Sequence, residues 1–253
     1  MIKPESMIKK APRIHVAADL RVGGDVVLPE GPARHVARVL RLAEGAALRL
    51  FDGAGLEAEA VLSEASRKRV VARIERVAPG VAESPLAVHL GQAIAKGDRM
   101  DYAIQKAVEL GVAAITPLYT EHGDVRLKGE REARKLAHWQ AVAASACEQC
   151  GRAVVPPVHP PRPLADWLAA RDEALRLVLH PATAGALEGA EAVAGVALLI
   201  GPEGGLSEAE VAAAREGGFA PLSLGPRILR TETAPVVALS LLQYRFGDLN
   251  GGA

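Results

Sequence analysis

From residue 86 to residue 246, apolar runs of strand length alternate with longer segments that have helical periodicity. Parallel strands in one sheet need long crossover connections, which are usually helices, so this alternation favours an α/β fold with a parallel sheet covered by helices on both faces. The expected strands are 86–91, 114–120, 176–180, 196–201 and 221–225, and the expected helices are 98–110, 130–150, 208–217 and a last one that ends near 246.

The residues before 80 have a different pattern, in which short β-like pieces recur and a single stretch is helical. The expected strands are 13–17, 25–28, 47–52, 56–62 and 69–77, and the expected helix is 32–42. This pattern is typical of a small β-barrel with one inserted helix. The turn-rich stretch 79–85 separates the two patterns, so we expect one domain over residues 1–79 and a second over residues 80–253.

The charge balance and the apolar runs exclude some classes of protein. The chain carries 30 Lys and Arg and 30 Asp and Glu, which argues against a uniformly basic binder. The longest uncharged apolar runs, 193–200 and 234–242, are far shorter than the roughly 20 residues that cross a bilayer. The first ten residues lack the apolar stretch of a secretory signal. We therefore expect no membrane span and a cytoplasmic location.

The potential metal ligands do not have the spacing of a metal site. The two cysteines, Cys147 and Cys150, lie three residues apart on an expected helix, and no second pair completes a zinc site. The histidines show no ligand spacing with one another. We expect no metal, and we interpret the cysteines as buried or half-buried thiols rather than a redox pair.

Ligands of open α/β sheets usually bind beyond the carboxyl ends of the strands, which directs attention to the loops at 180–181, 201–205 and 224–234. The glycine-rich loop 201–205 follows an apolar strand and precedes Ser207 and Glu210, which have capping-box spacing. Its glycines fit neither the dinucleotide nor the phosphate-loop pattern, which argues against NAD, ATP and GTP. A simple turn from strand to helix is the alternative interpretation.

The loop 224–234 contains Arg227 and Arg230 beside Thr231, Glu232 and Thr233. Part of this set has a structural explanation, because either threonine can cap the following helix and the glutamate suits its positive end. Capping does not explain two arginines, which are plausible contacts for an anion or RNA at a sheet's ligand edge. In the same way, Asp98 is expected to be the N-cap of the helix that follows Lys96-Gly97.

The helix expected near residue 35 has a basic row, formed by Arg34, His35, Arg38 and Arg41. Such a row is often only a solvated face, but no acid between residues 31 and 43 balances it. Contact with phosphates is therefore a fair hypothesis. The chain has three Phe, three Tyr and two Trp, too few for rows of stacked bases, so contacts with the RNA backbone and shape would have to carry RNA affinity.

Several motifs together resemble those of one family. They are Gly91-Gln92, Lys96-Gly-Asp-Arg99, Gln105-Lys106 with Glu109-Leu-Gly111, Glu148-Gln-Cys-Gly-Arg152, Leu199-Ile-Gly-Pro-Glu-Gly-Gly205 and Leu224-Gly-Pro-Arg-Ile-Leu-Arg-Thr-Glu-Thr233. This set resembles the RsmE-like family of small-subunit ribosomal RNA uridine N3-methyltransferases, in the SPOUT superfamily. The resemblance covers nearly the whole chain, and the last two motifs are its most specific part. Pro235 is a departure, because small residues are common there in the family.

The resemblance implies a trefoil-knotted C-terminal α/β methyltransferase domain, an N-terminal PUA-like barrel, a homodimer, and S-adenosylmethionine as cofactor. The substrate would be a specific uridine in 16S ribosomal RNA of the small subunit. Backbone groups would hold much of the cofactor, and the residues implied are Leu179, His180, Pro181, Ile200, Gly201, Glu203, Gly204, Gly205, Leu224, Gly225, Ile228, Leu229, Arg230, Thr231 and Thr233.

For the chemistry, Arg230 and then Arg227 are the candidates to stabilise negative charge on uracil, and Glu232 or Glu203 could accept a proton. Either carboxylate could instead pair with an arginine. The basic row of Arg34, His35, Arg38 and Arg41 would bind RNA. Two other functions stay open, a SPOUT enzyme that methylates ribose 2′-oxygens and a non-catalytic RNA-binding factor in ribosome assembly.

Overall fold

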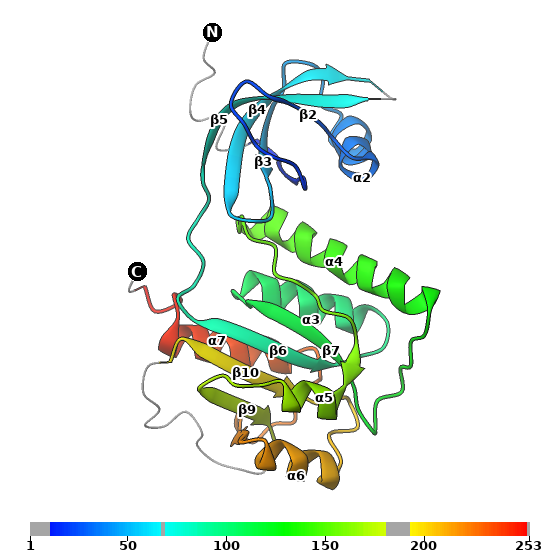
Figure 1. The fold of residues 1–253 in the computed structure, drawn as a ribbon, viewed down its shortest axis with the longest axis vertical. Coiled ribbons are helices and arrows are strands. Elements are labelled where there is room, and N and C mark those ends of the chain that lie inside the picture. The colour runs from blue at the N-terminus through cyan, green and yellow to red at the C-terminus, as the bar shows by residue number, and fades with distance from the viewer. Residues whose placement is uncertain (1–10, 67–68, 181–192, 252–253) are drawn as a thin grey trace. The chain divides into compact units, whose positions relative to one another are not determined.

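The computed structural model describes residues 11–66, 69–180 and 193–251. The chain forms two compact units (Figure 1). The first runs up to Glu83 and also includes Cys147–Val155, whereas the second consists of Ser84–Ala146 and the residues from Pro156 onward. None of the described helices is long and apolar enough to cross a membrane.

The first unit is built on a five-stranded sheet. Its strands are β1 (Arg13–His15), β2 (Asp25–Val27), β3 (Ala47–Phe51), β4 (Leu56–Ala65) and β5 (Val70–Pro79). Their order is β1-β3-β4-β5-β2, with β1 parallel to β3 and the other pairs antiparallel. Alternate residues of β4, such as Ala58, Ala60 and Leu62, are buried, as expected for a sheet with one face on a core.

The helix of the first unit differs from the expected one at its C-terminal end. Helix α2 (Glu30–Arg34) continues into the π-helical segment η1 (His35–Val39), where the Leu40 amide donates to the His35 carbonyl. The helix then ends, and Arg41 has a φ of 53°. The prediction of a helix to residue 42 was therefore wrong at this end, because the wider turn and the positive φ take Arg41 out of the helical row.

The second unit has a six-stranded parallel sheet. Its strands are β6 (Ala87–Ala93), β7 (Ala114–Tyr119), β8 (Arg162–Pro163), β9 (Leu175–Leu179), β10 (Gly195–Ile200) and β11 (Ala220–Leu222). The order is β11-β9-β10-β6-β7-β8, and all the pairs are parallel. The central strand β10 is buried from Val196 to Ile200, which explains its unbroken apolar run.

Helices cover both faces of this sheet, as the alternation predicts (Figure 1). They are α3 (Asp98–Glu109), α4 (Glu130–Cys150), α5 (Leu164–Ala169), α6 (Glu208–Glu216) and α7 (Ala234–Phe246). Leu199 of β10 packs in one cluster with Trp167 of α5 and Ala214 of α6. On the same face Gly91 has to be glycine, because a Cβ there would lie 2.7 Å from the Trp167 ring.

Two local details depart from the expectations. Strand β8 and helix α5 were not predicted, because both are short and follow a proline-rich stretch with little periodicity. Asp98 is not the N-cap of α3. That position is Gly97, whose φ of 60° suits glycine, and Asp98 is the first helical residue. Its carboxylate still lies in the first turn, near the positive end of the helix.

Candidate functional site

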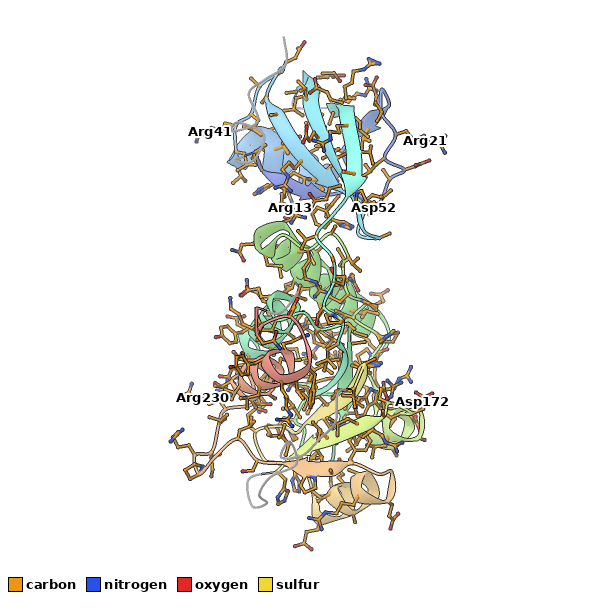
Figure 2. The ribbon with its side chains drawn as sticks, turned by 90° about the vertical axis from the view of Figure 1, so that its left-hand side faces the viewer. Arg13, Arg21, Arg41, Asp52, Asp172 and Arg230 are labelled. Atoms are coloured by element: carbon orange, nitrogen blue, oxygen red, sulfur yellow. The ribbon has the colours of Figure 1, made fainter. Side chains whose placement is uncertain are left out.

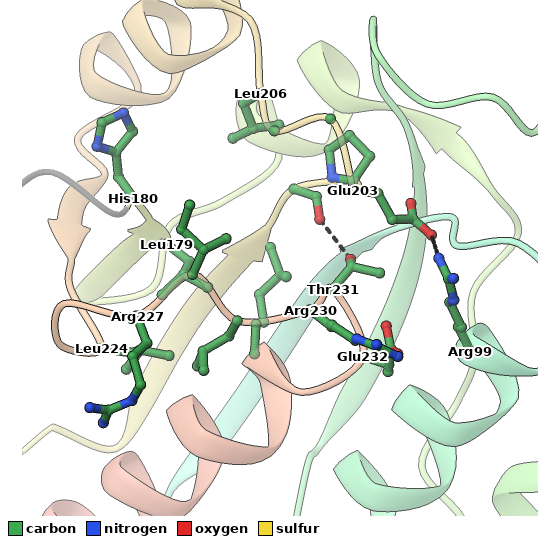
Figure 3. Close-up of a pocket in the computed structure, with 18 of the residues that line it drawn as sticks. Arg99, Leu179, His180, Glu203, Leu206, Leu224, Arg227, Arg230, Thr231 and Glu232 are labelled. Carbon is green, nitrogen blue, oxygen red and sulfur yellow. Dashed lines mark hydrogen bonds and ion pairs between the residues drawn. The ribbon is translucent and has the colours of Figure 1, made fainter.

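A pocket of about 630 Å³ lies beyond the carboxyl ends of β9, β10 and β11 (Figure 3). Leu179 and His180 at the end of β9 form one part of its wall, and the glycine-rich loop Gly201–Gly205 after β10 forms another. The loop between β11 and α7 supplies the remaining side. Parallel strands end at the same edge of a sheet, so segments far apart in the sequence meet there.

The glycine-rich loop is shaped by its packing and by the helix that follows. A Cβ on Gly201 would lie 3.0 Å from Cγ of Leu206, which is closer than an ordinary van der Waals contact, so Leu206 would have to shift to admit a side chain there. Gly205 has a φ of 74°, and its amide donates to the Pro202 carbonyl over 2.9 Å. The predicted capping box is confirmed, since Ser207 and Glu210 exchange hydrogen bonds at the start of α6. The loop therefore turns tightly and presents backbone to the pocket.

The β11–α7 loop contributes both charged and apolar side chains to the pocket. Arg227 and Arg230 are exposed, and Ile228 is 90% exposed. Figure 2 marks Arg230 on this loop. Glu232 is half-buried, and its buried Oε2 atom has no hydrogen-bond partner within the described residues. An unpaired buried carboxylate oxygen is costly, so this atom is available to a ligand or a proton.

A second carboxylate at the pocket has a partner. Oε1 of Glu203 lies 2.9 Å from Nη1 of Arg99, the second residue of α3 (Figure 3). The two side chains are 39% and 48% exposed, so the pair adds at most about 1 kcal/mol to stability. Its effect is local: it occupies the Glu203 carboxylate and ties the glycine-rich loop to the start of α3.

Comparison with known proteins assigns the chain to a family. A family model described as an RNA methyltransferase domain matches residues 82–243, and one described as an RNA methyltransferase PUA domain matches residues 28–75. Ribosomal RNA small subunit methyltransferase E of Buchnera aphidicola subsp. Schizaphis graminum is 36% identical over 246 residues, or 96% of this chain and 100% of the relative. The chain belongs to the ribosomal RNA small subunit methyltransferase E family.

Solved structures agree with membership of the methyltransferase E family. A methyltransferase from Legionella pneumophila, solved with bound S-adenosylmethionine, has a TM-score of 0.92 and 43% identity, covering 94% of this chain and 99% of that one. A ribosomal RNA small subunit methyltransferase E from Neisseria gonorrhoeae, also bound to S-adenosylmethionine, has a TM-score of 0.87 and 40% identity over the same shares. The expected SPOUT-type α/β fold with an N-terminal PUA domain is thereby confirmed.

The pocket gathers most of the residues that the resemblance to methyltransferase E implies for cofactor and catalysis. Pro181 lies outside the described residues, and Thr233 is the N-cap residue of α7, where its hydroxyl makes no capping hydrogen bond and does not line the pocket. The implied residues that line the pocket are Leu179, His180, Ile200, Gly201, Glu203, Gly204, Gly205, Leu224, Gly225, Arg227, Ile228, Leu229, Arg230, Thr231 and Glu232.

Four further residues line the pocket that were not among the named cofactor and catalytic residues, although Pro202 and Ala234 lie in the loops 201–205 and 224–234 that the strand-end rule selected. Arg99 follows β6, so the rule about strand ends could have found it, but it reads as part of a helix start. Pro202 lies within the glycine-rich loop and Leu206 follows it directly, and neither side chain carries a polar group that would single it out. Ala234 is the first residue of α7, and nothing in its chemistry marks it. The complete set of additions is Arg99, Pro202, Leu206 and Ala234.

The basic row of the PUA domain is only partly brought together. Arg34 and Arg38 line a surface hollow of about 330 Å³ that Ser66 and Arg69, from the connection between β4 and β5, also line. His35 and Arg41 are exposed but do not line it, and Figure 2 marks Arg41 at the surface. Glu30 lies at the same hollow, and Arg69 pairs with Glu64 over 3.0 Å. The hollow still holds more arginines than carboxylates.

The two cysteines are buried or half-buried thiols, as expected. Cys147 is buried and Cys150 is half-buried, and neither forms a disulfide. Contact with the Cys150 thiol and burial raise the pKa of Cys147 well above its usual range, so its thiol stays protonated. In the parts of the chain that the structure describes, no group of three or more His, Cys, Asp or Glu is arranged so that it could hold a metal ion.

Proposed function

We propose that the chain transfers a methyl group from S-adenosylmethionine to N3 of a specific uridine in 16S ribosomal RNA of the small subunit. The observation that carries the proposal is the convergence of Arg230, Glu232 and the glycine-rich loop on one pocket at the carboxyl edge of the sheet. The family supports the coarser activity, since its members are named for methylation of small-subunit ribosomal RNA.

The pocket residues fit S-adenosylmethionine. A volume of about 630 Å³ lies in the usual range for small-molecule sites. Leu179, Ile200 and Leu224 provide an apolar wall for a flat base, and the backbone of the Gly201–Gly205 loop can exchange hydrogen bonds with polar groups. When bound, S-adenosylmethionine supplies a methyl group on a positively charged sulfonium. The two relatives solved with this molecule support the assignment.

The chain's own residues would control the charge and the proton of the uracil ring. N3 of neutral uridine carries a proton, and its loss spreads negative charge onto the ring oxygens. Arg230 is placed to stabilise that charge, with Arg227 as the second candidate, because both exposed guanidiniums line the pocket. Glu232 is the better candidate to accept the proton. Its Oε2 has no partner within the described residues, whereas Glu203 pairs with Arg99.

The first domain, residues 1–79, would bind the RNA, and residues 80–253 would perform the methylation. Arg34 and Arg38 at the hollow, with His35 and Arg41 beside it on the surface, would contact phosphates. The target uridine has to leave its stack before N3 can be reached. A ribosomal substrate requires a cytoplasmic location, which is part of the proposal.

A homodimer is also part of the proposal. Large apolar side chains are exposed on neighbouring helices of the second unit: Leu241 and Tyr244 of α7 are 42% and 64% exposed, and Tyr102 of α3 is 45% exposed. Exposed apolar side chains that gather on one face mark association surfaces. A second copy of the chain would bury them.

Nucleoside identification tests the chemistry. Purified protein is incubated with labelled S-adenosylmethionine and small subunits that lack the modification, and the digested RNA is examined by mass spectrometry. We expect the label in N3-methyluridine. Label on a ribose 2′-oxygen would show the other SPOUT reaction, and tight cofactor binding without any transfer would favour a non-catalytic role in ribosome assembly.

A further inference from the structure

Gln92 is a fully buried amide at the end of an apolar strand. It is the next-to-last residue of β6, where Leu90, Gly91 and Ala93 are buried too, and it pairs in register with Ile200 of β10. Its Nε2 donates to Oγ1 of Thr231 and to the Ala93 carbonyl, each over 3.2 Å. Its buried Oε1 has no hydrogen-bond partner within the described residues, so the two bonds of Nε2 are what offset the cost of burying the amide.

The partner Thr231 is itself 5% exposed and lies between Arg230 and Glu232 in the β11–α7 loop. Its hydroxyl donates to the Gly201 carbonyl over 2.8 Å (Figure 3). A threonine hydroxyl has one hydrogen, so with that hydrogen on Gly201 its oxygen can only accept from Gln92. The amide orientation of Gln92 and the direction of both hydrogen bonds follow from this single fact.

These bonds form a relay from Gln92 through Thr231 to Gly201, and each member belongs to a different segment of the site. Gln92 ends β6, Gly201 starts the glycine-rich loop, and Thr231 lies in the loop with the candidate catalytic residues. The Gln92–Thr231 bond is buried, and the Thr231–Gly201 bond is part-buried at the wall of the pocket, so water has little access to the first bond. The geometry of the relay therefore fixes where the β11–α7 loop lies relative to the glycine-rich loop.

We propose that Gln92 and Thr231 are positioning residues for the methyl transfer. This inference rests on the proposed function, but it concerns side chains that need not touch either substrate. The relay holds the loop that carries Arg230 and Glu232 against the loop that would hold the cofactor. Neither the glycine pattern nor the arginines of the sequence assign this task to Gln92.

Substitutions at the first member of the relay, Gln92, and at its middle member, Thr231, should differ in effect. Thr231→Val keeps the shape but leaves both the Gln92 amide and the Gly201 carbonyl without this partner, whereas Thr231→Ser keeps the hydroxyl. Gln92→Leu removes the donor and leaves the Thr231–Gly201 bond in place. We therefore expect Thr231→Val to be the most damaging, Gln92→Leu to be intermediate and Thr231→Ser to be nearly normal.

Gln243→Leu is the matched control. Gln243 is also a fully buried glutamine of the second unit, where it accepts from Ser84 over 2.6 Å and donates to the Gly111 carbonyl over 3.2 Å. It does not line the pocket. Its replacement should lower thermal stability through the same loss of buried hydrogen bonds without a specific effect on the β11–α7 loop.

The experiment measures hydrogen exchange of residues 224–237 in the protein without cofactor, then S-adenosylmethionine affinity by calorimetry, and then the methylation rate at saturating cofactor. For Thr231→Val we expect the hydrogen-exchange rate of residues 224–237 and the dissociation constant for S-adenosylmethionine to rise about 10-fold or more. The methylation rate should fall by more than the loss of stability explains. In Thr231→Ser the exchange rate, the dissociation constant and the methylation rate should lie within about 3-fold of the wild-type values. Should Thr231→Val fail to fold, Gln92→Leu provides the same comparison.

Normal exchange and normal affinity in Thr231→Val and Gln92→Leu would overturn the inference. Equal changes in Gln243→Leu would overturn it as well, because they would show general destabilisation. Failure of the proposed function is distinguishable: the wild-type protein would then bind no S-adenosylmethionine or transfer no methyl group, while exchange in the protein without cofactor would still report on the relay.

Discussion

Arg230, Thr231 and Glu232 are consecutive residues with three different environments. Arg230 is exposed, the Thr231 hydroxyl is bound to the Gly201 carbonyl, and the Glu232 Oε2 is buried without a partner within the described residues. The sequence places all three at the ligand edge of the sheet. It does not separate their roles, because helix capping explains a threonine or a glutamate at this position equally well.

At the residue scale, Glu232→Gln should lower the methylation rate at saturating cofactor by about 100-fold or more, since an amide cannot accept the N3 proton. Affinity for S-adenosylmethionine should change little. Single-turnover kinetics on small subunits measures the first effect and calorimetry the second. The matched control is Glu203→Gln, whose carboxylate pairs with Arg99 and should matter less. A wild-type rate in Glu232→Gln would remove this residue as the base.

At the scale of elements, strand β6 carries a polar cluster away from the pocket. Nε2 of His89 lies 2.9 Å from Oγ1 of Thr116, and its Nδ1 accepts from Arg171, which also pairs with Glu173 over 2.9 Å. Burial, followed by the charges of Arg171, His159 and Arg162, lowers the pKa of His89 to about 3. The imidazole is therefore neutral in the folded protein, where its Nδ1 accepts from Arg171 and its Nε2 donates to Oγ1 of Thr116.

This cluster predicts acid sensitivity. The unfolded chain takes up a proton at His89 near its ordinary pKa of 6.5 and the folded chain does so only near 3, so stability should fall as pH decreases through this window. The slope from His89 should reach at most about 1.4 kcal/mol per pH unit. Urea unfolding at several pH values measures it. His89→Gln should flatten the slope, and an unchanged slope would exclude His89 as its source.

The basic hollow of the first unit is built from several elements: β2, α2, η1 and the start of β5 all contribute lining residues. Arg38→Ala should weaken binding of ribosomal RNA and reduce the slope of log affinity against log salt by about 1, because one phosphate contact is lost. Filter binding at several salt concentrations measures both effects. Arg76→Ala is the control, since Arg76 is an exposed arginine of β5 that does not line the hollow. An equal effect of the two substitutions would point to net charge alone.

At the scale of the whole molecule, the proposed homodimer would bury the exposed Tyr102 of α3 and Leu241 and Tyr244 of α7. We expect the wild-type protein to sediment as a dimer and Tyr244→Asp to shift it toward the monomer, because a carboxylate would be buried at the contact. Val22→Asp, at a residue that is 67% exposed in the first unit, should leave the dimer intact. A monomeric wild-type protein in sedimentation velocity would contradict the expected dimer.

The grouping of Cys147–Val155 with the first unit is a second whole-molecule feature. The His15 amide donates to Oε1 of Glu148 over 2.9 Å, and the Gly55 amide donates to the Ala153 carbonyl over 3.2 Å. A Cβ on Gly80 would lie 2.2 Å from the Ala153 Cβ. A boundary drawn along the sequence cannot show this, since the segment begins in the last turn of the long helix α4, which belongs mostly to the other unit.

By itself, the sequence determined the order and type of most elements and the edge at which the pocket forms. These properties follow from local periodicity and from the rule that parallel strands end together. The tertiary structure decided which atoms meet there: Arg99 with Glu203, Thr231 with Gly201 and Gln92, and the segment from Cys147 with the first unit. Each of these contacts joins residues far apart in the chain, so it depends on packing that no local pattern encodes.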